Sequence, residues 1–182
     1  MQISELKAEL EKLHDSSFGW ALSCCRHDAA EAEEVLQTVY LKILEGKARY
    51  GGESKLKTWL FAVIRKTAAS ERRRRLLRMM KPLGGTAAVF NSEPAAALER
   101  SDLQRRFQEA LKCLPRRQRE TLHLVFYQDL SLREAAQVMG ISIGSARRHY
   151  ERGKERLREA LDGKESQYAV GWRRKENSGA VL

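Results

Sequence analysis

The stretch between Leu114 and Leu161 restricts the possible folds more than any other part of the chain, because helix start and stop signals follow one another closely in it. Pro115 suits the first turn of a helix, where the missing N–H of proline costs nothing. Ser131 and Glu134 match a capping box, so a second helix should begin directly after Ser131. The apolar side chains expected on one face of the first helix are Leu122, Val125 and Phe126.

A third helix follows after a short turn. Gly140 stands where a helix commonly ends in a left-handed residue, and Ser142 can cap the next helix. The expected buried stripe of the third helix consists of Ala146, Tyr150, Gly153 and Leu157. The outward positions are then Ser145, Arg148, Arg152 and Glu155, with Arg147 and His149 on the flanks. Helices joined in this way by a short glycine-containing turn predict a helix-turn-helix.

The charge balance favours a polyanionic partner. The chain holds 34 Lys and Arg against 24 Asp and Glu, a formal net charge of +10, as expected for a protein that binds nucleic acid. An arginine-rich helix face can enter a major groove and read guanine or grip phosphate. Taken alone, these arginines could merely solvate a surface helix. The small residues Ala135 and Ala136, which allow two helices to cross closely, favour DNA binding.

The N-terminal half contains two contrasting helical patterns. In AEAEEVLQTVYLKIL the apolar stripe is Leu36, Val39, Tyr40 and Ile43, and the more exposed positions are Glu33, Glu34 and Gln37. In KLKTWLFAVIRKTAASERRRR, Leu56, Trp59, Leu60 and Val63 have helical spacing, and Lys55, Lys57, Arg65 and Lys66 form a basic surface. Trp59 is more often core than a base-stacking platform. The run from Arg72 to Arg75, beside this basic helix, favours phosphate contact.

The apolar pattern is helical throughout and predicts an all-α protein of two small helical domains joined by a flexible linker, the C-terminal domain being a helix-turn-helix. Pro82, Gly84, Gly85 and Pro94 interrupt the periodicity. We expect an N-terminal domain over residues 1–80, a linker over 81–97, the helix-turn-helix domain over 98–162 and a tail of unknown role over 163–182. For the tail, disorder is expected of a terminus, although partner binding or folding back onto a domain stays open.

Other classes of protein lack support in the sequence. No run of 18 apolar residues predicts a membrane span, and the N-terminus lacks the features of a secretory signal, so a cytoplasmic protein is expected. Cys24, Cys25 and Cys113 form neither a disulfide framework nor a metal-finger spacing, and a redox role for Cys24 and Cys25 stays open. We expect no metal, no cofactor and no enzymatic activity, because no nucleophile–base pair or phosphate loop is evident.

Together these segments resemble the extracytoplasmic-function (group IV) sigma factors of bacterial RNA polymerase. AEEVLQTVYLKIL is similar to their core-binding helix, GGESKLKTWLFAVIRKTAASERRRR to their −10 recognition helix, and the stretch 114–161 to their −35 domain. The resemblance covers most of the chain from Phe18 to Leu161. It implies a sigma factor that directs promoter-specific initiation with core RNA polymerase and promoter DNA as partners, and an anti-sigma factor as a further candidate partner.

The resemblance also implies roles for individual residues. Those implied to bind core polymerase are Glu33, Glu34 and Gln37. Those implied to bind the melted −10 strand are Gly52, Glu53, Ser54, Lys57, Thr58, Trp59, Arg65, Lys66, Arg72 and Arg73. Those implied to bind the −35 duplex are Arg119, Arg133, Ser145, Arg147, Arg148, His149 and Arg152. His149 stands where Arg is usual, which weakens the charge at that position near pH 7.

A stand-alone helix-turn-helix regulator is the alternative hypothesis. Such a protein should bind duplex DNA specifically without polymerase, usually as a dimer whose half-sites lie about one turn apart. The sequence shows no obvious dimerisation heptad, which argues against it.

Overall fold

The computed structural model describes residues 3–80 and 109–161, and every regular element in these two ranges is helical. The expected linker over 81–97 and the tail over 163–182 lie outside the described residues. The elements of the N-terminal half are α1 (Ile3–Lys12), α2 (His14–Cys24), α3 (Ala29–Leu44) and α4 (Leu56–Met79). Those of the C-terminal half are α6 (Arg116–Leu122), the π-helical turn η1 (His123–Tyr127), α7 (Leu132–Met139) and α8 (Ile143–Leu161).

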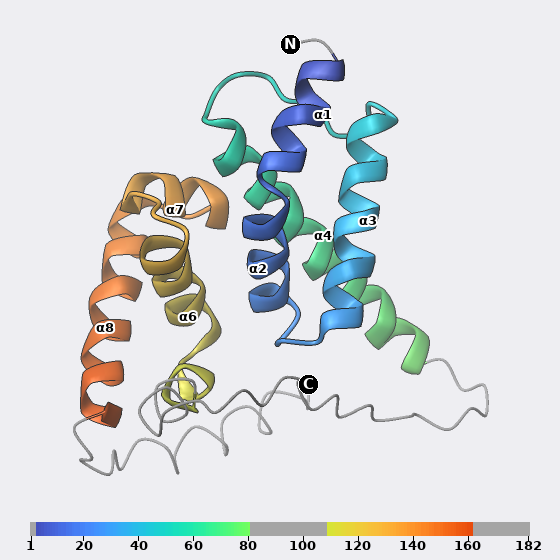
Figure 1. Ribbon diagram of the computed structural model, residues 1–182. Coiled ribbons are helices and arrows are strands. Elements are labelled where there is room, and N and C mark those ends of the chain that lie inside the picture. The colour runs from blue at the N-terminus through green and yellow to red at the C-terminus, as the bar shows by residue number, and fades with distance from the viewer. Residues whose placement is uncertain (1–2, 81–108, 162–182) are drawn as a thin grey trace, which may run out of the picture.

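The N-terminal helices pack around the apolar faces of α2, α3 and α4 (Figure 1). Asp28 caps α3, because its carboxylate accepts a hydrogen bond from the Glu31 N–H at 2.9 Å. The expected stripe on α3 is confirmed, with Tyr40 half-buried and Leu36, Val39 and Ile43 buried. On α4 only Leu60 of the expected stripe is buried, and Leu56, Trp59 and Val63 are half-buried. The other large apolar side chains in the core are Phe61 and Ile64, since α4 packs against α2, α3 and α7.

The predicted start and stop signals of the helix-turn-helix are confirmed. Ser131 and Glu134 form a complete capping box at the start of α7, and Gly140 ends α7 at a φ of 63°. Ser142 Oγ accepts a hydrogen bond from the Ser145 N–H at 3.2 Å and so caps α8. Pro115 lies one position earlier than expected, at the N-cap of α6.

The expected apolar face of the first helix is wrong at Phe126, whose side chain is 55% exposed. The helix changes to π-helical geometry at His123, and the wider turn shifts each later side chain around the axis. Leu122, before this turn, is buried as expected. Within the turn Leu124 points into the core, whereas the Phe126 ring stacks on Tyr150 of α8 with ring centroids 5.7 Å apart.

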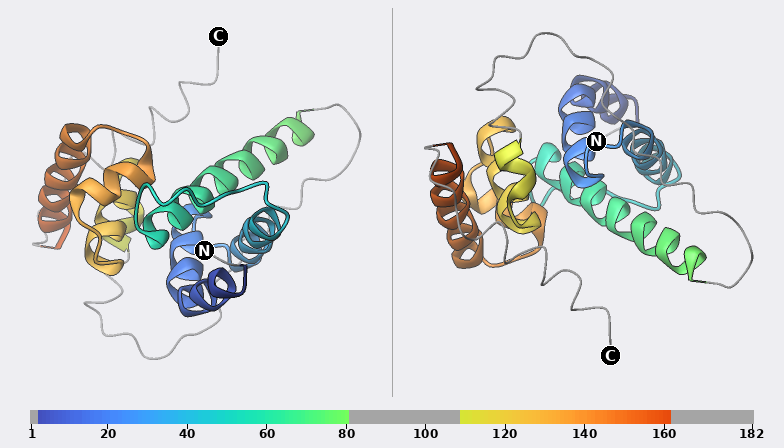
Figure 2. Two further views of the ribbon diagram at one scale, coloured as in Figure 1. Left: turned by 90° about the horizontal axis from the view of Figure 1, so that it is seen from above. Right: turned by 90° about the horizontal axis from the view of Figure 1, so that it is seen from below.

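The two halves of the chain pack against each other. The first turns of α4 lie beside α7, and the rest of α4 runs away from the C-terminal helices (Figure 2). Leu124, Leu130 and Ala135 of the C-terminal half belong to the same apolar core as Trp20 and Phe61 of the N-terminal half. None of the described helices is long and apolar enough to cross a membrane.

Candidate functional site

One candidate surface is the outer face of α3. Glu33, Glu34 and Gln37 are all exposed there, as the sequence predicted. Leu41 and Leu44 extend the same face toward the end of the helix, and their side chains are 58% and 48% exposed. Apolar side chains beside acidic ones on an exposed face are typical of a surface that another protein covers. The sequence reasoning missed both leucines, although their positions outside the buried stripe were a usable signal.

The acidic face is connected to the basic run at the end of α4. Arg75 Nη2 lies 2.6 Å from Glu34 Oε2, and Arg75 Nη1 lies 3.5 Å from Glu31 Oε2. Arg75 is therefore part of the α3 surface, whereas Arg73 is exposed. Arg72 is half-buried, and its guanidinium pKa is lowered by desolvation and then by the charges of Arg116 and Arg26.

The second candidate surface begins in the loop before α4. Gly52 has a φ of 78°, a left-handed conformation that suits glycine, and both Gly52 and Glu53 are exposed. Trp59 is half-buried, with its ring 5.4 Å from that of Tyr50. Ser54 is half-buried too, and its carbonyl accepts a hydrogen bond from the Tyr50 hydroxyl. Thr58, which the resemblance implies to bind the −10 strand, is buried on the inner side of the first turn of α4, and that role stays a prediction.

The basic side chains at the start of α4 contact the C-terminal half of the chain. Lys57 Nζ donates to the Gln128 carbonyl at 2.8 Å, and Lys55 Nζ lies 2.9 Å from Glu134 Oε1. Arg65 Nη1 donates to the Met139 carbonyl at 3.1 Å. Lys66 is exposed. Lys57 and Arg65 are therefore bound by groups of the same chain, whereas Lys66 faces solvent.

Glu120 is the centre of this polar contact. Its side chain is 1% exposed and lies 3.1 Å from Arg65 Nε and 2.7 Å from Arg116 Nε. A buried carboxylate needs such partners, since an unpaired charge in the interior is strongly unfavourable. The sequence reasoning missed Glu120. The signal in the sequence was one acidic residue within a basic segment. Its partner across the interface, Arg65, lies 55 residues away in the sequence.

An apolar contact accompanies the polar one. Trp20 is fully buried, its indole N–H donates to the Phe61 carbonyl at 3.0 Å, and its ring lies 5.4 Å from that of His123. Burial lowers the pKa of His123 to about 4, so its imidazole is neutral at pH 7. We call this whole contact, from Trp20 and α4 to α6, η1 and α7, the domain interface.

The third candidate surface is the outer face of α8. Arg147, Arg148 and Arg152 are exposed, and Ser145 and His149 are half-buried. The pKa of His149 is lowered by desolvation and then by the charges of Arg117, Arg152 and Arg148. The buried side of α8 is also as expected, with Ala146 and Gly153 in the interior. Arg133 is exposed on α7, the helix that precedes the turn.

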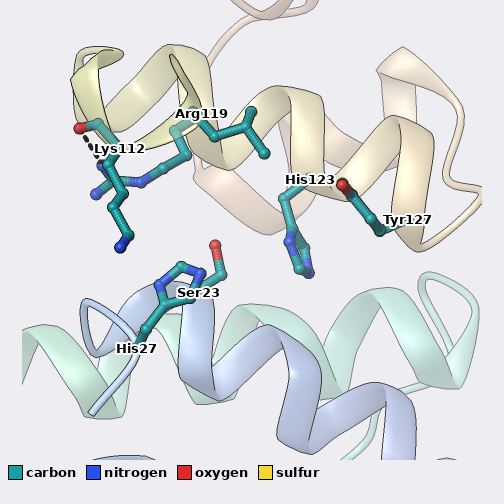
Figure 3. Close-up of a pocket in the computed structure, with 7 residues that line it drawn as sticks. Ser23, His27, Lys112, Arg119, His123 and Tyr127 are labelled. Carbon is teal, nitrogen blue, oxygen red and sulfur yellow. Dashed lines mark hydrogen bonds between the residues drawn. The ribbon is translucent and has the colours of Figure 1, made fainter. Parts of the chain in front are cut away.

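Arg119 is not on this face. It lines a pocket in the domain interface, together with Ser23 and His27 of the N-terminal half. α6 turns this side chain toward α2 (Figure 3), so Arg119 lies apart from the α8 arginines, and its implied role in −35 binding stays a prediction.

Comparisons with known proteins agree with this arrangement. The family Sigma-70 region 2 matches residues 10–77, and the family Sigma-70, region 4 matches residues 104–157. An ECF RNA polymerase sigma factor of Rhodopseudomonas palustris, EcfG, is 30% identical over 142 residues, which are 76% of each chain. The RNA polymerase sigma factor SigZ of Bacillus subtilis is 26% identical over 137 residues, covering 75% of this chain and 76% of that protein.

A solved structure has the same fold. The sigma factor RpoE of Bartonella quintana, in complex with the anti-sigma factor NepR, has a TM-score of 0.66 and 27% sequence identity, and the match covers 89% of this chain and 99% of that one. With both sigma regions present in order, and with a 30% identical relative matched over most of its length, this chain belongs to the ECF sigma factors of RNA polymerase.

Proposed function

We propose that this sigma factor divides promoter recognition among the three surfaces described above. The α3 face, with Glu33, Glu34 and Gln37, binds core RNA polymerase. The 46–55 loop and α4 hold the melted −10 strand, and the α8 face binds the −35 duplex. The observation that carries the proposal is that α3 exposes its three candidate residues and α8 exposes its three arginines in the same structure. The chain itself performs no catalysis, because RNA synthesis belongs to the polymerase, and it acts in the cytoplasm with that enzyme.

The domain interface gives this proposal a conformational step. Lys57 and Arg65, two candidate −10 contacts, bind the Gln128 carbonyl, the Met139 carbonyl and Glu120 in this closed arrangement. A single strand carries phosphates that would compete for the same cations. Strand capture therefore requires the halves to separate, and the binding of core polymerase to α3 supplies part of the free energy for that separation.

An anti-sigma factor is a further candidate partner. The RpoE relative was solved with NepR, and the structural match covers 89% of this chain and 99% of RpoE. We propose that a partner of this kind binds this chain in its closed arrangement, in which Lys57 and Arg65 are occupied.

Transcription with purified components tests the proposal. The full chain and core polymerase should together initiate from a small set of promoters in a genomic library, and neither should do so alone. Arg148→Ala should lower promoter affinity about tenfold, within the range for one lost arginine contact, whereas Arg158→Ala, an exposed arginine near the end of the same helix, should not.

A second pair of variants separates docking from DNA binding. Glu34→Lys should weaken binding to core polymerase, and the matched control Glu11→Lys, on the exposed side of α1, should bind normally. If Glu34→Lys binds core polymerase normally, the proposal that the α3 face binds core polymerase is wrong. Specific duplex binding by the chain alone, as a dimer, would instead favour the stand-alone regulator.

A further inference from the structure

A pocket of about 60 Å³ lies in the domain interface, between the end of α2 and the helices of the C-terminal half. Figure 3 shows the side chains of Arg119, Lys112, His123 and Tyr127 on one side of this space and those of Ser23 and His27 on the other. Leu111 completes the lining. One buried water needs roughly 10–15 Å³ on the same measure, so this space holds several water molecules or one small tetrahedral ion.

The lining is cationic and rich in hydrogen-bond donors. Arg119 and Lys112 are cationic side chains, His27 and His123 each offer a ring N–H, and Ser23 and Tyr127 offer hydroxyl groups. No carboxylate is among the described residues that line the pocket. The cationic side chains of the lining all come from the C-terminal half, and on the other side the pKa of His27 is lowered by burial and then by the charges of Arg119 and Lys112.

Arg119 has an incomplete set of partners. Its Nη1 donates to the Lys112 carbonyl at 3.3 Å. Its Nε is buried, and within the described part of the chain this atom has no hydrogen-bond acceptor. Buried arginine nitrogens are normally hydrogen-bonded, so an orphaned one beside an open space indicates a missing acceptor.

The backbone holds His27 at this pocket in an uncommon conformation. His27 has a φ of 68°, in the left-handed region that non-glycine residues rarely occupy, and its N–H donates to the Leu22 carbonyl at 2.8 Å. This conformation ends α2 with the imidazole pointing into the pocket, across from Lys112 (Figure 3).

We propose that this pocket binds a phosphate oxyanion, either inorganic phosphate or the phosphate group of a small phosphomonoester. Its oxygens would accept hydrogen bonds from Arg119 Nε and Lys112 Nζ of the C-terminal half and from Ser23 and His27 of the N-terminal half. Arginine and lysine are the usual phosphate-binding side chains, and the hydroxyl and imidazole groups supply the remaining donors.

The bound anion stabilises the closed arrangement, because it accepts hydrogen bonds from both halves and offsets the positive charge of Arg119 and Lys112 at the interface. A ligand that binds only the closed form increases the ratio of closed to open chain by a factor of 1 + [L]/Kd. Given the sigma-factor role proposed above, phosphate would then reduce the amount of sigma factor that is open for the −10 strand. This regulatory consequence rests on that role, whereas phosphate binding itself does not.

Calorimetric titration of the full chain with inorganic phosphate, against chloride at equal ionic strength and pH, tests the proposal without polymerase or DNA. The wild-type chain should bind one phosphate. Arg119→Gln should weaken binding at least tenfold, and Arg117→Gln, an exposed arginine on the same helix and outside the pocket lining, should bind within twofold of wild type.

A second variant, Lys112→Gln, keeps the test valid if Arg119→Gln fails to fold. Lys112 is exposed, so its replacement should leave the fold intact. This variant should weaken phosphate binding severalfold. A parallel titration with glycerol 3-phosphate separates the two sources, since tighter binding than inorganic phosphate indicates a phosphomonoester ligand and weaker binding indicates free phosphate. Absence of phosphate binding by the wild-type chain, or an equal loss in Arg117→Gln and Arg119→Gln, would overturn the proposal.

Discussion

Glu120→Gln is the substitution that most directly tests how the two halves are held together. The side chain keeps its size and one oxygen acceptor but loses its charge. Glu120 is 1% exposed and accepts hydrogen bonds from Arg65 and from Arg116. Arg65 and Arg116 bind different oxygens of Glu120, and glutamine keeps only one acceptor oxygen. Hydrogen bonds to charged groups contribute about 1.5–3 kcal/mol, so the lost acceptor should cost about 2 kcal/mol, or about 1 kcal/mol for each contact on average.

The two bonds have different consequences. Arg116 lies on the same helix as Glu120 and is partly screened by solvent, so this bond affects the stability of the C-terminal half. Arg65 lies on α4 and is 19% exposed, so its bond crosses the domain interface. The total free energy of unfolding should therefore fall by about 2 kcal/mol. The interfacial share of about 1 kcal/mol should lower the ratio of closed to open chain about fivefold.

Urea unfolding measures the first quantity, and thiol labelling measures the second. Cys24 is buried, and its pKa is raised well above its ordinary value by burial and then by the charge of Glu120, which places it near the domain interface. Its labelling rate, resolved from the other cysteines by mass spectrometry, should rise about fivefold if labelling follows opening. Glu155→Gln, an exposed charge on α8, is the matched control and should change neither value.

The reasoning is refuted if Glu120→Gln unfolds at the same urea concentration as Glu155→Gln and its Cys24 is labelled at the wild-type rate. A double-mutant cycle with Arg65→Gln locates the effect. The coupling between positions 65 and 120 should be about 1 kcal/mol, because the two side chains share one charge-assisted bond.

Three further outcomes follow from the structure. The buried His123 has a pKa of about 4, whereas in the unfolded chain its pKa is about 6.5. Between these values the unfolded chain binds a proton that the folded chain does not bind. The contribution of His123 to the free energy of unfolding is therefore fully present above pH 6.5 and is lost as the pH decreases toward 4. Between pH 7.5 and pH 5 the loss should be about 2 kcal/mol by urea unfolding, and a slope that persists unchanged in His123→Phe would assign it to other groups. Gly153→Ala places a Cβ 3.0 Å from a Leu122 methyl carbon, whereas Gly144→Ala meets no atom within 4 Å. Thermal unfolding should show the Gly153 variant less stable than the Gly144 variant by about 1–3 kcal/mol, and equal stabilities would contradict the tight packing of α6 on α8. His149→Arg should tighten promoter binding by the polymerase complex and steepen its salt dependence by about one counterion, because the lowered pKa keeps His149 neutral at pH 7.5. An unchanged salt slope would place His149 away from the DNA backbone.

The elements that were predicted correctly depend on short-range interactions. The capping box at Ser131, the left-handed Gly140 and the Ser142 cap each act within three or four residues of the chain, so a sequence read alone reveals them. The buried and exposed faces of α3 and α8 follow from the same local periodicity. Phe126 is the instructive failure, because a π-helical turn changes that periodicity without a signal in residue type.

The sequence resemblance assigned binding roles to residues without showing which of their side chains are accessible on the surface. Thr58 is buried in the first turn of α4, and Arg119 faces a pocket beside α2 instead of the α8 arginines. Lys57 and Arg65 bind groups that lie 71 and 74 residues further along the chain. No local pattern predicts such contacts, because they form only when two separately patterned helical units dock.

The amino-acid sequence by itself determined the helices, their ends, the helix-turn-helix and the family, because caps, periodicity and motifs are properties of neighbouring residues. The tertiary structure alone decided which cations are free and which are occupied. Burial of Glu120 requires both Arg116 and Arg65. Arg116 reaches it from the same helix, whereas Arg65 reaches it only because α4 packs against the C-terminal half, through α7. The same packing brings Arg119 and His27 to one pocket, which no residue spacing in the sequence indicates.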